Sequence, residues 1–356
     1  MQPFKKKFSI ENIPDLRGKV AIVTGGATGI GKQTVIQLLR RNAKVYIASR
    51  SVSKFDQLLH DLESTDANVA ERLKFLALDL SDMRSCIIAA KQFTELEQRL
   101  DVLIENAALS VMPNTLSKDG IEIQFAGNFT NLPVKIFNNL QYLGHFVFTH
   151  HLLSLIQATS ETFGEARIVI VASHAHSMYQ PAGPDKIDYE NIKTEGAASI
   201  DNFAEVKASL QRYSRSKLAN ILFAQNLHKR LQESGCFGVY VNSLNPGTIG
   251  IAPGTESAAI PPIFGLISSS IVRLTSIPPE DGALTTLLLA TDIEIQTKAL
   301  SGRYFDVGPM AGKFYYGYSW DATDSKMSLL AKDAQLAENL WNWSINAMQS
   351  VKEASW

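Results

Sequence analysis

A tyrosine and a lysine four residues apart are the residues in this sequence best suited to proton transfer. Tyr213 and Lys217 open a stretch whose apolar residues recur at helical spacing, so a helix over 213–233 would place both on one face. A phenol with a pKa near about 10 is a poor proton relay at neutral pH, but a nearby ammonium lowers that pKa. The pair therefore predicts a general acid or base if a cofactor site lies beside it. Without one, such a pair is a chance feature of many helices.

A glycine-rich turn upstream offers such a cofactor site. Thr24-Gly25-Gly26-Ala27-Thr28-Gly29-Ile30-Gly31 follows the first predicted strand, and a helix begins near Lys32. Glycine permits positive φ and close backbone approach, while the free N–H groups at a helix start suit a pyrophosphate. The spacing is G-x-x-x-G-x-G rather than the commoner G-x-G-x-x-G. The turn predicts a dinucleotide site that includes Gly25, Thr28, Gly29, Ile30, Gly31 and Lys32.

The end of the second predicted strand discriminates between dinucleotides. An NAD site usually carries Asp or Glu about 20 residues after the glycines, where it binds the adenosine 2′-hydroxyl, whereas an arginine there favours a 2′-phosphate. This strand ends in Ala48-Ser49-Arg50, without an acid. A guanidinium forms a charge-assisted fork with phosphate, and Lys32 and Ser49 are placed to assist. We therefore predict NADP(H) as the cofactor; the alternative for Arg50 is a solvated surface cation.

Two polar residues follow the third and fourth predicted strands. Asp79 ends the third strand, where it would meet the adenine edge, and Asn106 ends the fourth, where it would fix the loop around the cofactor. The alternative for each is a helix cap or a turn.

Short β-rich runs alternate with helical ones along the chain, which is typical of a parallel sheet covered on both faces. Strands are predicted over 19–23, 44–48, 74–78, 102–105, 167–172, 239–244 and 303–307, and helices over 32–41, 55–63, 83–99, 142–157, 213–233, 279–291 and 333–348. The expected fold class is α/β: a doubly wound, Rossmann-type fold with a largely parallel, seven-stranded sheet. The long segments 174–212 and 250–277 follow the fifth and sixth strands and are candidate substrate walls, or else surface decoration.

Composition excludes several classes of protein. The 34 Lys+Arg and 35 Asp+Glu residues give a net charge of −1, without the basic excess of nucleic-acid binders. Cys86 and Cys236 offer neither a disulfide framework nor a metal-ligand spacing, which suits a reducing compartment. Neither a signal peptide nor a spanning helix is predicted, because charges interrupt the N-terminal region and polar residues interrupt 136–160. We expect a cytoplasmic location.

Together these motifs resemble the short-chain dehydrogenase/reductase family over about residues 15–307. The resemblance is carried by the glycine turn, Asp79-Leu80, Asn106-Ala107-Ala108, Ser173, Tyr213 with Lys217, and Asn245-Pro246-Gly247-Thr248. The segment 168–176 and the long tail, with Leu340-Trp341-Asn342-Trp343, make the retinol-dehydrogenase-like branch the most similar. The resemblance implies one catalytic domain over 1–356, with a core of about 15–310 and a C-terminal helical tail of about 311–356.

The resemblance also implies a role for each matching residue. Tyr213 would be the general acid/base, and Lys217 would lower its pKa and bind the nicotinamide ribose. Ser173 would bond the substrate oxygen, while Thr248 and the neighbouring backbone would hold the carboxamide. The implied cofactor contacts are completed by Leu80, Ala107, Pro246 and Gly247.

The sequence departs from the family pattern at the fourth catalytic position, an asparagine. Phe125-Ala126-Gly127-Asn128 matches the front of that motif and Tyr142-Leu143-Gly144-His145-Phe146 its back, so 129–141 is an insertion. Asn128 is the candidate, with Asn139 as the alternative. Pro133 disfavours a continuous helix there. The insertion either loops outward, displaces the asparagine, or reflects a variant transcript.

The resulting expectation is an NADP(H)-dependent carbonyl reductase or alcohol dehydrogenase acting on a lipophilic small molecule, since the loop residues Ile260, Ile263, Phe264, Leu266 and Ile267 are apolar. The alternative is a nucleotide-binding protein impaired by the insertion. A third, less favoured interpretation is contact with a membrane through 258–272 and the early lysines. No metal and no nucleic-acid partner are expected. A homodimer through helices 142–157 and 213–233 is implied by the resemblance.

Overall fold

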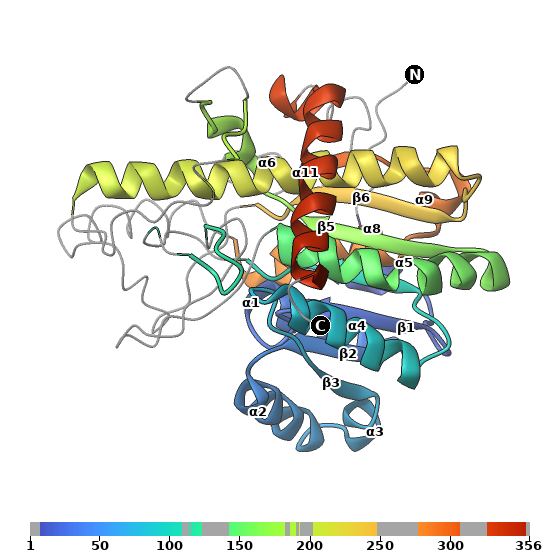
Figure 1. The fold of residues 1–356 in the computed structure, drawn as a ribbon. Helices are drawn as coiled ribbons and strands as arrows, with labels where there is room; N and C mark the ends of the chain where they lie inside the picture. Colours follow the sequence, from blue (N-terminus) through green and yellow to red (C-terminus); the bar gives the residue numbers. More distant parts are fainter. Residues whose placement is uncertain are drawn as a thin grey trace.

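The computed structural model describes residues 8–108, 114, 116–122, 142–181, 186–189, 192, 202–247, 277–306 and 326–353. In this part of the chain, seven strands form one sheet in the order β3-β2-β1-β4-β5-β6-β7, and each neighbouring pair is parallel (Figure 1). The chain leaves β1 toward one edge and returns beside it at β4, as in a doubly wound sheet. The predicted Rossmann-type α/β fold is confirmed.

Each predicted strand is present within one residue of its predicted ends, apart from residue 307, which lies outside the described residues. The strands are β1 (Val20–Thr24), β2 (Lys44–Ser49), β3 (Leu73–Ala77), β4 (Val102–Glu105), β5 (Ala166–Val171), β6 (Val239–Asn245) and β7 (Tyr304–Asp306). Alternate residues of a strand belong to two different hydrophobic cores, because successive side chains of a strand point to opposite faces of the sheet. Ile22 belongs to one buried cluster and Val23 to the other.

Helices cover both faces of the sheet. On one face lie α1 (Gly29–Arg40), α2 (Val52–Glu63), α3 (Ala67–Ala70), α8 (Pro279–Thr291) and α9 (Ile293–Thr297). On the other lie α4 (Met83–Leu96), α5 (Leu143–Phe163), α6 (Phe203–Glu233) and α11 (Ala334–Glu353). Short 3₁₀ turns occur at η1 (Ile10–Asn12), η2 (His174–Met178) and η4 (Leu330–Lys332).

Helix α6 begins ten residues before the predicted start, so the expectation of a continuous loop over 174–212 was wrong in its last part. Asn202 is the N-cap, and its side-chain Oδ1 accepts a bond of 3.0 Å from the backbone N–H of Glu205. That cap satisfies one of the N–H groups that a helix start leaves unpaired. Tyr213 therefore lies inside a helix, where its position is better fixed than it would be at a helix end.

Helix α11 crosses α6 and also contacts α5 and α4 (Figure 1). The ring of Trp341 packs edge-on against Phe146 of α5 at a centroid distance of 5.1 Å, and the guanidinium of Arg230 on α6 lies 4.5 Å from the Trp341 ring. The helices that the family resemblance implies as a dimer surface are thus contacted by a helix of the same chain. The homodimer and the single-domain organisation stay predictions.

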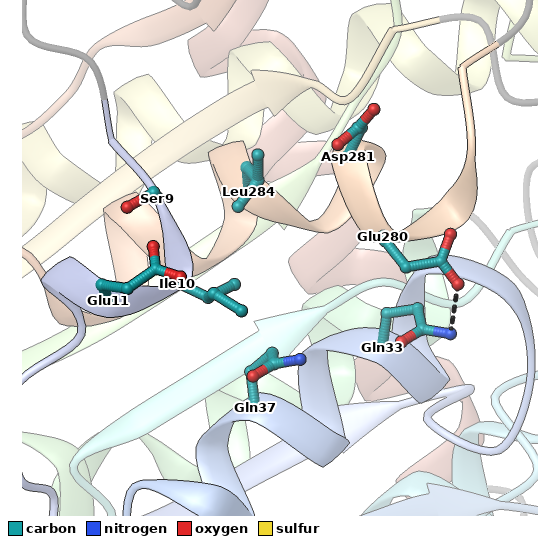
Figure 2. A pocket seen from close by; sticks show the side chains of 8 residues that line it. All are labelled: Ser9, Ile10, Glu11, Gln33, Gln37, Glu280, Asp281 and Leu284. Carbon is teal, nitrogen blue, oxygen red and sulfur yellow. Dashed lines mark hydrogen bonds between the residues drawn. The ribbon is translucent and has the colours of Figure 1, made fainter.

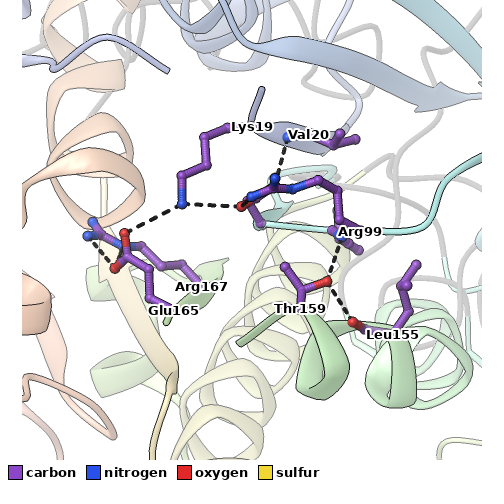
Figure 3. A network of polar contacts seen from close by, with 9 residues as sticks. Lys19, Val20, Arg99, Leu155, Thr159, Glu165 and Arg167 are labelled. Atoms are coloured by element: carbon purple, nitrogen blue, oxygen red, sulfur yellow. Dashed lines mark hydrogen bonds and ion pairs between the residues drawn. The ribbon is translucent and has the colours of Figure 1, made fainter. Parts of the chain in front are cut away.

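A polar network joins the amino-terminal edge of the sheet (Figure 3). The buried carboxylate of Asp101 accepts 2.9 Å from the N–H of Val20, 2.7 Å from Arg99 and 3.2 Å from Lys19. Lys19 also lies 4.0 Å from Glu165 at the start of β5. These contacts fix the starts of β1, β4 and β5, and so the positions of the ends where the candidate site lies.

None of the helices in the described ranges combines the length and apolarity that crossing a membrane requires.

Candidate functional site

The residues predicted to act together come from the carboxyl ends of β1, β4, β5 and β6 and from α6. In a parallel sheet these ends share one edge, where open α/β folds bind their ligands. Asn128, Asn139 and Thr248 lie outside the described residues, as do the insertion 129–141 and the apolar segment 258–272. Their predicted roles stay predictions.

The glycine turn after β1 is packed too closely for side chains. Gly25 and Gly29 have positive φ values of 62° and 54°. A Cβ added at Gly31 would lie 2.6 Å from both Gly25 O and Asn106 Nδ2. Helix α1 starts at Gly29, and the Thr28 side chain makes no capping bond to it. The first N–H groups of α1 therefore lack both an intrahelical acceptor and a side-chain cap, as an anion site requires.

Asn106 joins the end of β4 to this turn. Its Nδ2 donates to Thr24 O at 3.0 Å, while the backbone N–H groups of Asn106 and Ala107 each donate to Thr24 Oγ1 at 3.0 Å. The ring Nε2 of His145 lies 2.8 Å from the same hydroxyl. The sequence motifs include Thr24 and His145, but the sequence analysis assigned a role to neither. The signal that it missed is a buried hydroxyl shared by three segments.

Cationic side chains gather after β2. Arg50 Nη1 lies 3.8 Å from Asp79 Oδ1, and its side chain is 22% exposed. Burial and the charge of Arg50 both lower the pKa of Lys54, which shows that the two cations are held near one another. The Ser49 Oγ is buried without a hydrogen-bond partner. Lys54 was not predicted, although it follows Arg50 by four residues. Lys32 pairs with Asp61 of α2 at 3.3 Å.

Asp79 and Leu80 form a tight connection into α4. Asp79 Oδ1 accepts a bond of 3.1 Å from the N–H of Ser81, and the Ser81 hydroxyl also donates to it. The contacts of Asp79 with Ser81 are therefore those of a turn, which was the alternative interpretation of this residue. A Cβ added at Gly144 of α5 would lie 2.0 Å from Leu80 O, so α5 approaches this turn as closely as a glycine allows.

The structure brings Ser173, Tyr213 and Lys217 together. The Ser173 side chain follows β5 and lies close enough to the Tyr213 phenol to lower its pKa by hydrogen bonding. Lys217 is 1% exposed, its Nζ donates to Val171 O at 2.8 Å, and it lies 5.8 Å from the centre of the Tyr213 ring. Asn220 Nδ2 donates to the same carbonyl at 3.2 Å. These contacts fix the amine one turn of α6 beyond the phenol.

The electrostatic prediction for this pair needs correction. Burial raises the pKa of Tyr213, and the bond from Ser173 lowers it only in part; Lys217 makes no resolved contribution. Burial lowers the pKa of Lys217 to about 7, against the opposing charge of Glu105. A lysine with that pKa is only partly charged at neutral pH, so its effect on the phenol is weakened.

The segment after β6 continues the same edge. Asn245 Nδ2 donates to Asp306 Oδ1 at 2.7 Å, and Asn245 Oδ1 accepts 3.2 Å from the N–H of Gly247. Gly247 has φ +89°, and an added Cβ would lie 3.0 Å from Ile277 Cδ1. Pro246 and Gly247 therefore occupy a turn that favours glycine at its second position.

A buried carboxylate also forms ion pairs with the part of α6 around Tyr213. Glu122, which is inaccessible to solvent, lies 3.2 Å from Arg215 Nη2 and 3.5 Å from Arg212 Nε. These arginines flank Tyr213 in sequence. No local sequence signal indicates this contact, because about 90 residues separate its partners.

Within the described ranges, no group of three or more His, Cys, Asp or Glu side chains is placed to hold a metal ion. A surface cavity of about 310 Å³ lies between η1, α1 and the start of α8, with Gln33 Nε2 donating to Glu280 Oε1 at 2.9 Å (Figure 2). None of the predicted site residues lines it.

Comparisons with known proteins agree on one family. Residues 19–184 match the model of the short chain dehydrogenases. An uncharacterized oxidoreductase of Schizosaccharomyces pombe is 35% identical over 84% of this chain and 80% of its own length. Human retinol dehydrogenase 11 is 32% identical over 94% of this chain and 86% of its own. A solved structure of an uncharacterized protein from Mycobacterium paratuberculosis covers 97% of this chain and 98% of its own with a TM-score of 0.65 at 24% identity, which supports the fold.

Proposed function

This chain belongs to the short-chain dehydrogenase/reductase family of nicotinamide-dependent oxidoreductases, and we propose that it interconverts an alcohol and a carbonyl with NADP(H). The observation that carries the proposal is the contact of Ser173 with Tyr213 next to the buried Lys217. A hydroxyl pair and an amine at the carboxyl edge of the sheet suit proton transfer to or from a substrate oxygen.

Two features of the chain fit the dinucleotide. The close packing around Gly31 leaves backbone N–H groups at the start of α1 for a pyrophosphate, in a cradle that a Cβ would fill. The orphaned hydroxyl of Ser49, with Arg50 and Lys54, suits the 2′-phosphate that distinguishes NADP from NAD. We assign the pyrophosphate and adenosine contacts to Gly25, Thr28, Gly29, Ile30, Gly31, Lys32, Asp79, Leu80, Asn106 and Ala107, and the nicotinamide end to Tyr213, Lys217, Pro246, Gly247 and Thr248.

In the proposed reaction, the nicotinamide supplies or accepts the hydride when it is bound. Tyr213 donates the proton to the carbonyl oxygen in reduction and removes it in oxidation. Ser173 holds that oxygen by a hydrogen bond, and Lys217 holds the ribose. The fourth catalytic role is assigned to Asn128. These groups contribute positioning and preorganised donors around the reacting atoms.

The substrate is proposed to be a lipophilic small molecule. Two relatives are named retinol dehydrogenases, and retinol is an apolar alcohol. The apolar loop 258–272 supplies the sequence argument for the same class. The free thiols of Cys86 and Cys236 support the proposed cytoplasmic location, because they suit a reducing compartment.

Titration with NADPH and NADH tests the cofactor. Arg50→Ala and Lys54→Ala should each weaken NADPH binding by about tenfold, as the loss of a charge-assisted bond implies, and change NADH binding less than about twofold. Lys91→Ala, an exposed lysine of α4, is the matched control. Equal weakening of both nucleotides would contradict the 2′-phosphate assignment.

Turnover of NADPH with aldehydes and ketones of graded chain length tests the chemistry. Tyr213→Phe should keep NADPH binding and lose turnover by about 10²-fold or more. Binding without turnover in the wild-type protein across the panel would favour the nucleotide-binding, catalytically impaired alternative. Turnover by Tyr213→Phe at the wild-type rate would refute the role of the phenol.

A further inference from the structure

A buried carboxyl group lies next to the candidate site without a role in the proposed reaction. Glu105 is the last residue of β4, and its side chain is 1% exposed. Its Oε1 accepts a hydrogen bond from the Thr149 hydroxyl of α5. Its Oε2 is buried and has no hydrogen-bond partner among the residues that the structure describes. A buried carboxylate normally needs a full set of donors or an opposite charge, so its retention here calls for a partner.

Lys217 supplies that opposite charge from α6. Its Nζ donates one bond, to Val171 O at 2.8 Å, although an ammonium carries three donors. Val171 ends β5, the strand paired with β4, so Glu105 and Lys217 approach the same end of neighbouring strands. The charge of each favours the ionised form of the other. The two buried groups are therefore electrostatically coupled.

We propose that Glu105 is a positioning residue whose carboxylate, when ionised, is a counter-charge that favours the ammonium form of Lys217, with Thr149 stabilising that carboxylate. The importance of this pair for turnover rests on the proposed function, in which the ammonium binds the ribose. Glu105 touches neither substrate nor cofactor in this proposal and acts only through Lys217.

The titratable groups around the pair come from three elements. Helix α6 carries Lys217 and Tyr213, and the N-cap of α5 is Tyr142, whose pKa is raised by burial and also by the charge of Glu105. His145 of α5 lies one turn before Thr149, and its ring is hydrogen-bonded to the Thr24 hydroxyl. From β5 the contact is the backbone carbonyl of Val171, which does not titrate. Lys217 is thus the cation that faces Glu105 among these groups.

Both groups of the pair gain or lose a proton close to neutral pH. Burial raises the pKa of Glu105 to about 8, against the opposing effects of Thr149 and Lys217. Burial lowers the pKa of Lys217 to about 7, against the opposing effect of Glu105. A change in either group therefore alters the charge of the other within the pH range where the reaction would run.

Thermal unfolding of the nucleotide-free protein tests the pair without any assay of activity. The folded state binds more protons at Glu105 than the unfolded state between about pH 4.5 and 8, so the contribution of Glu105 to wild-type stability falls as pH rises through this window. In Glu105→Gln this loss of stability with rising pH is absent, because the glutamine side chain does not titrate. The midpoint of Glu105→Gln should therefore rise relative to wild type by about 2 °C or more between pH 5.5 and 8.5.

The same measurement in a Lys217→Met background isolates the coupling. Without the ammonium, the buried carboxylate is less favourable, so the gain from Glu105→Gln at pH 7.5, where both groups are partly ionised, should be larger than in the wild-type background. Equal gains in the two backgrounds would show that the groups do not interact and would overturn the proposal.

The pH profile of kcat/KM tests the consequence for turnover. Glu105→Gln should move the alkaline limb about one pH unit lower, which is about a tenfold loss above that limb. Thr149→Val should move it in the same direction by less, and Thr149→Ser, which keeps the donor, should leave it in place. An unmoved limb in folded Glu105→Gln would overturn the proposal. If no protein turns over any carbonyl, the proposed function fails, and the unfolding cycle still decides whether the pair exists.

Discussion

Substitution of Gly31 by alanine tests whether the glycine turn is shaped by close packing. The added Cβ would lie 2.6 Å from Gly25 O and from Asn106 Nδ2, and 3.0 Å from Gly26 Cα. Ordinary contacts begin at 3.4 Å, so the neighbours must move by about 0.8 Å. Asn106 can move only by disturbing its bond to Thr24 O, and the oxygen of Gly25 belongs to the backbone of the turn itself.

The expected cost follows from these contacts. Overpacking of a dense site costs about 1–3 kcal/mol, while Gly→Ala within a helix returns about 1 kcal/mol. The net loss of unfolding free energy should therefore be at most about 2 kcal/mol. The displaced turn should weaken nucleotide binding by about tenfold or more, because backbone N–H groups hold a pyrophosphate only in a fixed geometry.

Fluorescence titration with NADPH and thermal unfolding measure the two effects separately. Arg40→Ala is the control, because it lies exposed in the last turn of the same helix. A Gly31→Ala protein with wild-type NADPH affinity would refute the assignment of this turn to the pyrophosphate, whatever its stability.

Four further outcomes are expected. NADPH binding should take up protons above about pH 7, because burial lowers the pKa of Lys217 to about 7 and an anionic ligand favours the ammonium; calorimetry at pH 8 in buffers of different ionisation enthalpy measures this uptake. In the protein without nucleotide, the lowered pKa of Lys217 makes the unfolding free energy rise with pH between about 7 and the ordinary lysine pKa. The reason is that the unfolded state binds more protons than the folded state in this pH range. Glu122→Gln should cost about 3 kcal/mol in urea unfolding at pH 7, because Arg212 and Arg215 lose a buried counter-charge. Trp341→Ala should cost about 2 kcal/mol, against no change for the exposed Asn342→Ala, and an equal effect of the two would contradict the packing of α11 on α5 and α6.

The strands were predictable because each is a short apolar run with turn residues at its ends. In β1, for example, Ile22 and Val23 are both buried although they point to opposite faces, so the run is continuously apolar. Helix boundaries were harder. The start of α6 depends on Asn202 and Glu205, a cap that was read as part of a loop.

The candidate site was predictable where its residues form local motifs. The glycine turn and the Tyr213–Lys217 spacing are visible within a few residues of sequence. Glu105, Glu122 and Lys54 were missed because their importance comes from contacts with distant segments or from burial. The direction of the Tyr213 pKa was also missed, since spacing on a helix does not show where the lysine side chain points or how deeply it is buried.

The packing of α11 has a consequence for synthesis on the ribosome. The aromatic side chains of Phe146 and Phe223 contact Trp341, which is made more than 100 residues later. The nascent chain therefore exposes an apolar surface on α5 and α6 until residues through 353 have emerged. During that interval the surface is available to chaperones and to other unfinished chains. Shortening the chain within α11 should accordingly lower the yield of soluble protein in cells even where the sheet itself assembles.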